Sequence, residues 1–243
     1  MRILLIVAAV LFLCSPSWAE ESITLQAIVY PPLVYEVGGS VFGVVPDVVR
    51  AIQVQIGDHN PLVIMPWLRA YEQAQHGKRQ GLFAIVRTPE REKLFKWVGP
   101  VFSEGDYFFK KRGSYLSPRT LEHARGDFKI AVRRDGYTHQ ALKAKGFTNL
   151  DVGPSYDSSY RKLAQGRVDL VLMGERTYYY MVKKAGLNPE EFERTNVLFA
   201  ESSAWLAFSR DIPDSTIDRW QEALDNLKVN GIYDDIMQRN FQH

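Results

Sequence analysis

Two arginines, Arg87 and Arg91, stand where the chain could bind an anion. They follow the apolar run Gly81–Val86, which is typical of a buried strand in a parallel sheet. In open α/β sheets, ligands bind at the carboxyl ends of the strands, beside helix N-termini. A guanidinium can hold both oxygens of a carboxylate, so this position predicts an anion site. Arg91 could instead form a surface salt bridge with Glu90 or Glu92.

The segments on both sides of this run must position the arginines. Residues 67–76 have the apolar spacing of a helix, and Trp67 and Arg69 in its first turn are further candidate ligand contacts. Arg69 could equally be a solvated helix residue. Pro89 suits the first turn of a second helix because it lacks a backbone N–H, and Thr88 is placed to cap that helix.

The rest of the chain alternates between short apolar runs and helical patterns, an order that predicts a parallel sheet. The expected strands are residues 23–27, 62–65, 81–86, 107–111, 129–132, 150–152, 168–173 and 197–208. The expected helices are residues 48–56, 67–76, 117–124, 138–146, 156–165, 176–185, 217–230 and 233–237. The strands at 107–111 and 197–208 would cross between two lobes, with Ser202 and Ser203 as the hinge.

The first 19 residues have the pattern of a secretory signal peptide. Arg2 supplies a positive charge, residues 3–13 form an apolar run, and a small-x-small cleavage sequence ends at Ala19. The run is too short to cross a bilayer, which takes about 20 residues, although an N-terminal membrane anchor is the alternative. Cys14 invites a lipoprotein interpretation, but Leu13 before it is not small. Cleavage after Ala19 would remove the only cysteine.

Composition narrows the classes of function. The 243 residues carry a formal net charge of +2 with both signs interspersed, which argues against nucleic acid as a partner because that requires a basic face. A single cysteine allows no disulfide within the chain. The five histidines have no ligand spacing, so neither a metal site nor a cofactor is predicted. The nucleophile-elbow, phosphate-loop and C-x-x-C motifs are absent from the sequence.

The order of these landmarks resembles one known family. A strand followed by T-P-E-R and the aromatic-rich segment 95–100 is similar to the family 3 bacterial extracellular solute-binding proteins, and the resemblance covers nearly the whole chain after residue 22. It implies an α/β fold, a two-lobed periplasmic-binding-protein clamshell of type II. Two parallel-rich sheets flanked by helices would be joined by two crossing strands. Lobe one would comprise residues 20–107 and 202–243, with lobe two, residues 108–201, inserted.

The resemblance also implies ligand contacts. Arg91 would hold the carboxylate of an amino acid from lobe one. Gly136, Tyr137 and Thr138 would add backbone N–H groups and a hydroxyl at a helix start in lobe two, although Thr138 could be a plain N-cap. Tyr30, after the first strand, would stack on the ligand unless it only packs against its own loop.

The chain departs from the family pattern where the amino group of such a ligand would bind. The family usually has small hydroxyl residues late in the strand before T-x-x-R, where this chain has Ala84, Val86 and Arg87 in a segment one residue shorter. It also usually has an acid after the second strand of lobe two, where this chain has Gly174. Glu175 could replace that acid with an offset of one residue. Otherwise the ligand would be a different anion.

Together these implications predict a periplasmic solute-binding protein, a monomer without enzymatic activity. It would capture a small anionic or zwitterionic, amino-acid-like solute for an ABC permease of the inner membrane. One alternative is a ligand sensor that signals to a membrane partner without transport. The other is an enzyme resembling periplasmic cyclohexadienyl dehydratases, in which Glu175 would act as the general acid while Arg91 and Thr138 hold carboxylates.

Overall fold

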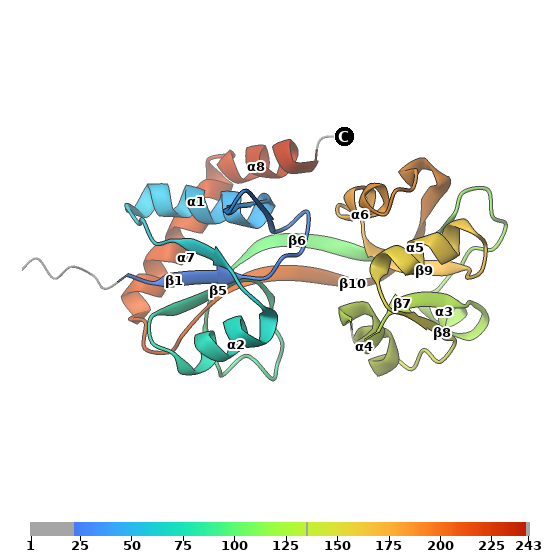
Figure 1. Cartoon of the computed structure of the whole chain (residues 1–243), viewed down its shortest axis with the longest axis horizontal. Helices are drawn as coiled ribbons and strands as arrows, with labels where there is room; N and C mark the ends of the chain where they lie inside the picture. Colours follow the sequence, from blue (N-terminus) through green and yellow to red (C-terminus); the bar gives the residue numbers. More distant parts are fainter. Residues whose placement is uncertain (1–21, 135, 242–243) are drawn as a thin grey trace, which may run out of the picture.

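The computed structural model describes residues 22–134 and 136–241. The signal peptide predicted for residues 1–19 lies outside the described residues. Figure 1 shows two groups of helices and strands joined by two long strands, β6 (Lys96–Lys111) and β10 (Phe192–Phe208). We call the group that contains the first strands of the chain lobe one and the other group lobe two.

The strands form one mixed sheet through both lobes, in the order β4-β1-β5-β10-β6-β9-β7-β8. In lobe one, β1 pairs in parallel with β4 and β5, and in lobe two β7 pairs in parallel with β8 and β9. Between them β6 and β10 are antiparallel to each other. The α/β class and the two-lobed architecture are therefore confirmed, with the two parallel portions fused by the crossing strands. The strand bounds are β1 (Thr24–Ala27), β4 (Leu62–Ile64), β5 (Gln80–Val86), β7 (Ile130–Arg133), β8 (Leu150–Gly153) and β9 (Leu170–Gly174).

Lobe one is packed around apolar residues from both ends of the chain. Valines and Ile52 on the buried face of α1 meet Trp220 and Leu224 of α7 over the sheet. Spacing of three and four residues places these side chains on one helix face. The helices of this lobe are α1 (Val44–Ile56), α2 (Trp67–His76), α7 (Asp214–Val229) and α8 (Ile232–Phe241), and a small hairpin is formed by β2 (Tyr35–Val37) and β3 (Ser40–Phe42).

Lobe two has apolar clusters on both faces of its strands. Phe108 and Leu170 contribute to one cluster, whereas Phe109 and Val171 contribute to the other, because successive residues of a strand point to opposite faces. Its helices are α3 (Leu121–Asp127), α4 (Tyr137–Ala144), α5 (Tyr156–Ala164) and α6 (Tyr178–Lys184), with a short 3₁₀ helix, η2 (Pro189–Glu191). Within residues 22–134 and 136–241, every helix is too short or too polar to span a membrane.

Two expected helix starts are wrong. The segment after Thr88 forms turns, in which the N–H of Arg91 donates to the carbonyl of Thr88 at 3.0 Å. Its backbone hydrogen bonds join residues three apart, as in a turn, and the segment does not continue into a helix. In lobe two, α3 begins at Leu121 instead of Ser117, because the Thr120 hydroxyl accepts a hydrogen bond from the His123 N–H at 3.1 Å and caps the helix there.

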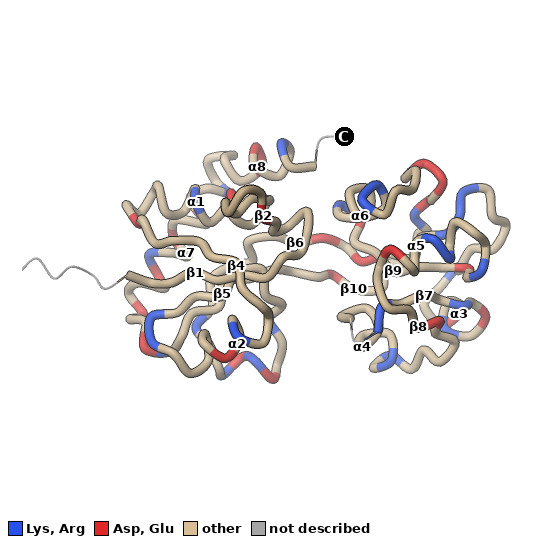
Figure 2. The backbone as a smooth tube through the Cα atoms, viewed as in Figure 1, with Lys and Arg blue, Asp and Glu red and all other residues tan. Residues whose placement is uncertain are grey.

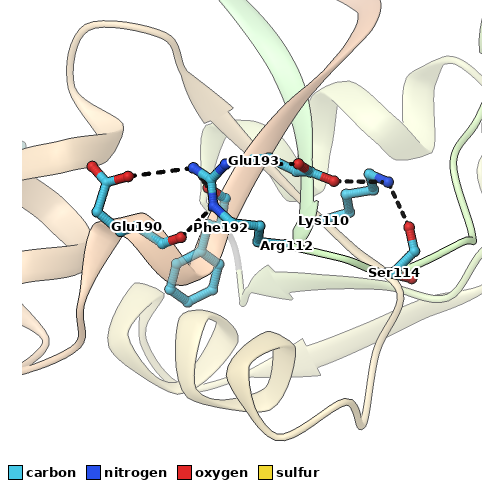
Figure 3. Close-up of polar contacts among 6 residues, drawn as sticks. All are labelled: Lys110, Arg112, Ser114, Glu190, Phe192 and Glu193. Atoms are coloured by element: carbon cyan, nitrogen blue, oxygen red, sulfur yellow. Dashed lines mark hydrogen bonds and ion pairs between the residues drawn. The ribbon is translucent and has the colours of Figure 1, made fainter.

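A charged network ties together the ends of the crossing strands in lobe two (Figure 3). Lys110 lies 2.9 Å from Glu193 and donates to the Ser114 carbonyl at 2.6 Å. Arg112 reaches the Glu190 carboxylate at 3.4 Å. The Arg112–Glu190 pair is exposed and contributes little by itself, whereas Lys110 is mostly buried against Glu193. We interpret the network as fixing the register of β6 against β10.

Between the lobes, residues 200–204 of β10 pair in continuous register with residues 102–106 of β6. The register of β10 against β6 shifts on both sides of residues 200–204, and Ser103 Oγ lies 2.8 Å from Ser203 Oγ across the strands. Irregular pairing of this kind bends and twists a strand. The lobe boundaries predicted near residues 107 and 201 fall inside β6 and β10, and their positions remain a prediction.

Candidate functional site

Two carboxylates project from one face of β6 between the lobes. Asp106 pairs with Gly174 of β9 and Ala200 of β10, and Glu104 pairs with Ser202. Residues two apart in a strand share a face, so both acids lie on the same side of the crossing strands. Figure 2 shows acidic positions concentrated on the strands between the lobes.

Glu104 is buried, with 8% of its surface exposed, and its carboxylate is fully engaged. It accepts hydrogen bonds from the backbone N–H groups of Arg176 and Thr177 at 3.0 and 3.1 Å and from the Thr177 hydroxyl at 3.0 Å. These N–H groups precede α6, so Glu104 satisfies donors at the start of that helix. A Cβ on Gly174 would lie 2.1 Å from the Glu104 carboxylate, so glycine at this position leaves the space that Glu104 occupies.

Asp106 is 5% exposed, and its Oδ2 atom is buried without a hydrogen-bond partner. Burial, followed by the neighbouring Glu104 charge, raises the pKa of Asp106 to about 7, while hydrogen bonds from Ser202 and Tyr137 act in the opposite direction. A buried oxygen without a donor is unfavourable by about 1–3 kcal/mol. It is therefore the polar group of this region most in need of a partner.

Burial and then the charge of Glu175 raise the pKa of Glu104, but the Glu175 carboxylate is itself paired elsewhere. Glu175 follows Gly174 and points to the opposite face of the sheet, where its carboxylate lies 3.5 Å from Arg194. The Arg194 guanidinium lies 4.1 Å from the centre of the Tyr107 ring on that same face. The register of β9 against β6 decides this orientation, and the sequence alone does not show it.

Lobe two contributes a cluster of hydroxyls and one cation. Gly136 is the N-cap of α4, and Tyr137 at its first position hydrogen-bonds Asp106; burial, followed by Asp106, raises the pKa of Tyr137 to about 12. Thr138 hydrogen-bonds Tyr156 of α5. The guanidinium of Arg133, at the end of β7, lies 5.5 Å from the Tyr156 ring centre. A Cβ on Gly136 would lie 3.1 Å from the Tyr156 hydroxyl, so this turn is closely packed.

Tyr30 faces this cluster from lobe one. It lies in the loop after β1 and keeps 40% of its surface exposed, yet desolvation by the surrounding protein raises its pKa strongly. Tyr156, Glu104 and Asp106 raise that pKa further, whereas Arg133 opposes them. The structure thus brings Tyr30 within electrostatic range of Tyr156 in α5, Arg133 at the end of β7 and the two acids of β6.

The lobe-one arginines lie over aromatic rings. Arg91 donates to the Val86 carbonyl at 3.0 Å, and its guanidinium lies 5.3 Å from the Trp67 ring and 5.5 Å from the Tyr71 ring. Such stacking holds a planar cation while leaving its edge available for an anion. Arg69 is exposed on α2, the same helix as Trp67.

Arg87 has a different partner. Its guanidinium contacts Glu92 at 2.7 and 2.5 Å and lies 4.7 Å from the Trp205 ring and 5.6 Å from the Trp97 ring. The salt bridge considered for Arg91 is therefore made by Arg87. The Glu92 bond is the main cause of a raised Arg87 pKa.

Sequence reasoning missed three residues of this region: Asp106, Arg133 and Tyr156. Arg133 carried a usable signal, because it follows an expected strand just as Arg87 does. Asp106 carried none, because a carboxylate inside a strand is buried or exposed according to its pairing. Among the described residues, no group of three or more histidine, cysteine, aspartate or glutamate side chains is arranged to hold a metal ion.

Comparison with solved structures supports the fold. A histidine kinase sensor domain with similarity to periplasmic binding proteins is 21% identical, with a TM-score of 0.73, over 91% of this chain and 96% of its own. The GluR0 ligand-binding core from Nostoc punctiforme, in complex with L-glutamate, is 21% identical, with a TM-score of 0.70, over 91% of this chain and 100% of its own.

The amino acid ABC transporter substrate-binding protein AbpA from Streptococcus pneumoniae, bound to L-arginine, is 18% identical, with a TM-score of 0.70, over 90% of this chain and 94% of its own. At these identities the likeness concerns the fold. Comparison with curated protein sequences found no match. The family model for bacterial extracellular solute-binding proteins, family 3, matches residues 25–243. The chain belongs to this family of solute-binding proteins.

Proposed function

We propose that this chain is a periplasmic solute-binding protein that captures a small carboxylated, amino-acid-like solute between its lobes for an ABC importer. The observation that carries the proposal is the match of the family model for extracellular solute-binding proteins to residues 25–243. Within the fold, Tyr30 of lobe one interacts electrostatically with Tyr156 and Arg133 of lobe two and with the acids of the crossing strands. A solute beside it would contact both lobes at once.

The charges around this region suit a ligand with two opposite charges. Arg91 in lobe one and Arg133 in lobe two supply cations, and Asp106 supplies the opposite charge when ionised. Tyr30 and Tyr156 supply flat surfaces for the body of the solute. A solute that contacts both lobes favours the conformation in which they are closest, because only there are all of its contacts made.

The proposal places the mature protein in the periplasm as a monomer after removal of residues 1–19. The family is extracellular by its description, which supports export. Intact-mass measurement of the exported protein tests the cleavage. A mass that includes the leader, or a lipid on Cys14, would contradict this part of the proposal.

Binding is tested directly with purified protein freed of bound solute. Isothermal titration calorimetry against the common L-amino acids, dicarboxylates and simple amines should identify one or a few solutes that bind saturably. Small-angle scattering with that solute should then show a smaller radius of gyration. If dicarboxylates bind and amino acids do not, the amino-acid-like part of the proposal is wrong.

A ligand sensor is the second candidate. The solved sensor domain of a histidine kinase has a TM-score of 0.73 to this chain, similar to the 0.70 of the transporter protein from Streptococcus pneumoniae. Uptake of the identified solute, labelled isotopically, distinguishes the two functions. Cells without the gene should lose uptake if the protein serves an importer and should retain it if the protein is a sensor. Analysis of the solute after incubation with the protein detects a dehydratase, because only an enzyme would change it.

A further inference from the structure

The described part of the chain has two buried acids between its lobes, and they differ in what they bond. Glu104 gives both carboxylate oxygens to donors at the start of α6. It also fills the space beside Gly174, the position at which the resembled family usually carries an acid. Glu104 is therefore engaged in holding the start of α6 against β6, mainly through its Oε2, which accepts from the Arg176 and Thr177 N–H groups.

Asp106 has one carboxylate oxygen without a hydrogen-bond partner. Its Oδ2 is buried and has no hydrogen-bond partner, although the residue lies on the same face as Glu104 and beside the first residue of α4. Tyr137, which hydrogen-bonds Asp106, is itself 41% exposed. A ligand donor that displaces this exposed side chain from Asp106 would reach the carboxylate from the solvent side.

From this geometry we propose that Asp106 binds the cationic group of the ligand, as a carboxylate supplied by the crossing strand β6 instead of by lobe two. The inference rests on the proposed function and specifies it: the solute carries an ammonium or a similar cation in addition to its carboxylate. An N–H donor from this cation would satisfy Oδ2, and its charge would compensate the ionised acid.

The groups around Asp106 make its ionisation sensitive to such a ligand. Glu104 on the same strand and Glu201 on β10 disfavour its negative charge, whereas Ser202 on β10 and Tyr137 on α4 donate hydrogen bonds to it. Tyr30 after β1 and Tyr156 on α5 also interact with it electrostatically. With a pKa of about 7, Asp106 is partly protonated at neutral pH, and a bound cation would drive it to ionise.

The test uses calorimetry on the wild-type protein and on Asp106→Asn. Each L-amino acid that binds is compared with its α-hydroxy acid, which has a hydroxyl in place of the ammonium. The wild type should prefer the amino acid by about 10- to 150-fold, the range for a hydrogen bond to a charged group. Asp106→Asn should lose most of that preference while still binding both compounds through the carboxylate.

Glu193→Gln is the matched control, because Glu193 is also an acid of β10 but lies in lobe two, where its carboxylate is paired with Lys110. It should keep the wild-type preference. A second measurement needs no variant: wild-type affinity for the amino acid should rise by up to about 100-fold between pH 5 and pH 8, as Asp106 ionises around pH 7. Asp106→Asn should show a flat profile over the same range.

The possible results separate this inference from the proposed function. If Asp106→Asn keeps the full preference for the amino acid, or if hydroxy acids bind the wild type equally well, the assignment of Asp106 is overturned and solute binding stands. A wild-type affinity that does not change with pH also overturns it. If no amino acid, dicarboxylate or amine binds, the proposed function and the assignment fail together.

Discussion

The arginines of lobe one and the carboxylates of the crossing strands are accommodated in different ways. Arg87 is exposed and Arg91 is half-buried, and both guanidiniums lie over indole or phenol rings. Glu104 and Asp106 are buried on a strand that runs through both lobes. A planar, weakly hydrated cation stays charged on an aromatic surface, whereas a buried carboxylate needs donors or takes up a proton.

This difference indicates how each side would respond to a ligand. The lobe-one side is charged at any physiological pH and is held in place by its rings. The acidic side changes its charge near neutral pH, so its state depends on what is bound. We therefore expect substitutions in lobe one to change affinity alone, and substitutions on β6 to change both affinity and stability.

Removing the Asp106 charge should have the largest effect, and this effect is on the free energy of unfolding. The folded-state pKa of about 7 lies above the ordinary aspartate value, so the folded protein binds this proton more tightly than the unfolded chain does. The stabilisation from protonated Asp106 is therefore complete below about pH 4 and is lost as the pH rises through 7. Without ligand, Asp106→Asn should be more stable than the wild type by about 2–4 kcal/mol at pH 8, with little difference near pH 4. Urea unfolding at both pH values measures this. Equal stabilities at pH 8 would contradict the burial of an ionised Asp106.

Removing Arg91 should have an effect of similar size on binding. Arg91→Ala should weaken the affinity for the identified solute by about 2–4 kcal/mol, or about 30- to 1000-fold, because a forked, charged bond is lost. Arg91→Lys should recover only part of this, since an ammonium lacks the planar fork. Arg87→Ala is the control, because Arg87 is already paired with Glu92. If Arg87→Ala weakens binding and Arg91→Ala does not, the anion site is assigned to the wrong arginine.

A methyl group at position 174 tests how tightly the Glu104 carboxylate is packed between β6 and α6. Gly174→Ala would place a Cβ 2.1 Å from the Glu104 carboxylate and push it away from its donors. The free energy of unfolding should fall by about 1–3 kcal/mol, as for other overpacked sites. Gly126→Ala is a suitable control, because a Cβ there meets nothing within 4 Å. It should be neutral or slightly stabilising. Thermal unfolding of both variants measures the contrast, and equal melting temperatures would contradict it.

The smallest effect is expected at Tyr30. Tyr30→Ala should weaken binding by about 0.5–1.5 kcal/mol if its ring stacks on the solute, whereas Tyr30→Phe should be close to the wild type. Calorimetry with the identified solute measures both variants. A large loss in Tyr30→Phe would instead indicate that the hydroxyl, near Tyr156 and Asp106, makes the contact.

Regular periodicity made most of the fold predictable. Helix 67–76 has the expected bounds, and the buried strand after it begins only one residue earlier than predicted. The segment after Thr88 was less predictable, because Pro and Thr are equally suited to a turn and to a helix start. The α/β class follows from the alternation of elements, which depends on many residues at once. The two crossing strands were implied by the family resemblance, and β6 begins at Lys96, well before the expected start at Tyr107.

The site was harder to predict because it depends on the pairing of distant strands. Which face Glu175 and Asp106 point to depends on the register of β6 against β9, which local patterns do not encode. The engagement of Glu104 with Thr177 is likewise a contact between residues far apart in sequence. The prediction that Tyr30, Tyr137 and Thr138 contact one ligand came from the family resemblance, and it stays a prediction.

The apolar clusters of the two lobes are built from different parts of the sequence, and this affects the order in which they can fold. Both clusters of lobe two use residues between Tyr107 and Ala200, whereas the main cluster of lobe one joins Ile23–Phe102 to residues 204–241. A chain that emerges from its N-terminus first can therefore complete the lobe-two clusters while α7 and α8 are still absent. Until those helices arrive, α1 and the sheet of lobe one keep part of their apolar surface uncovered, a state prone to aggregation and to capture by chaperones.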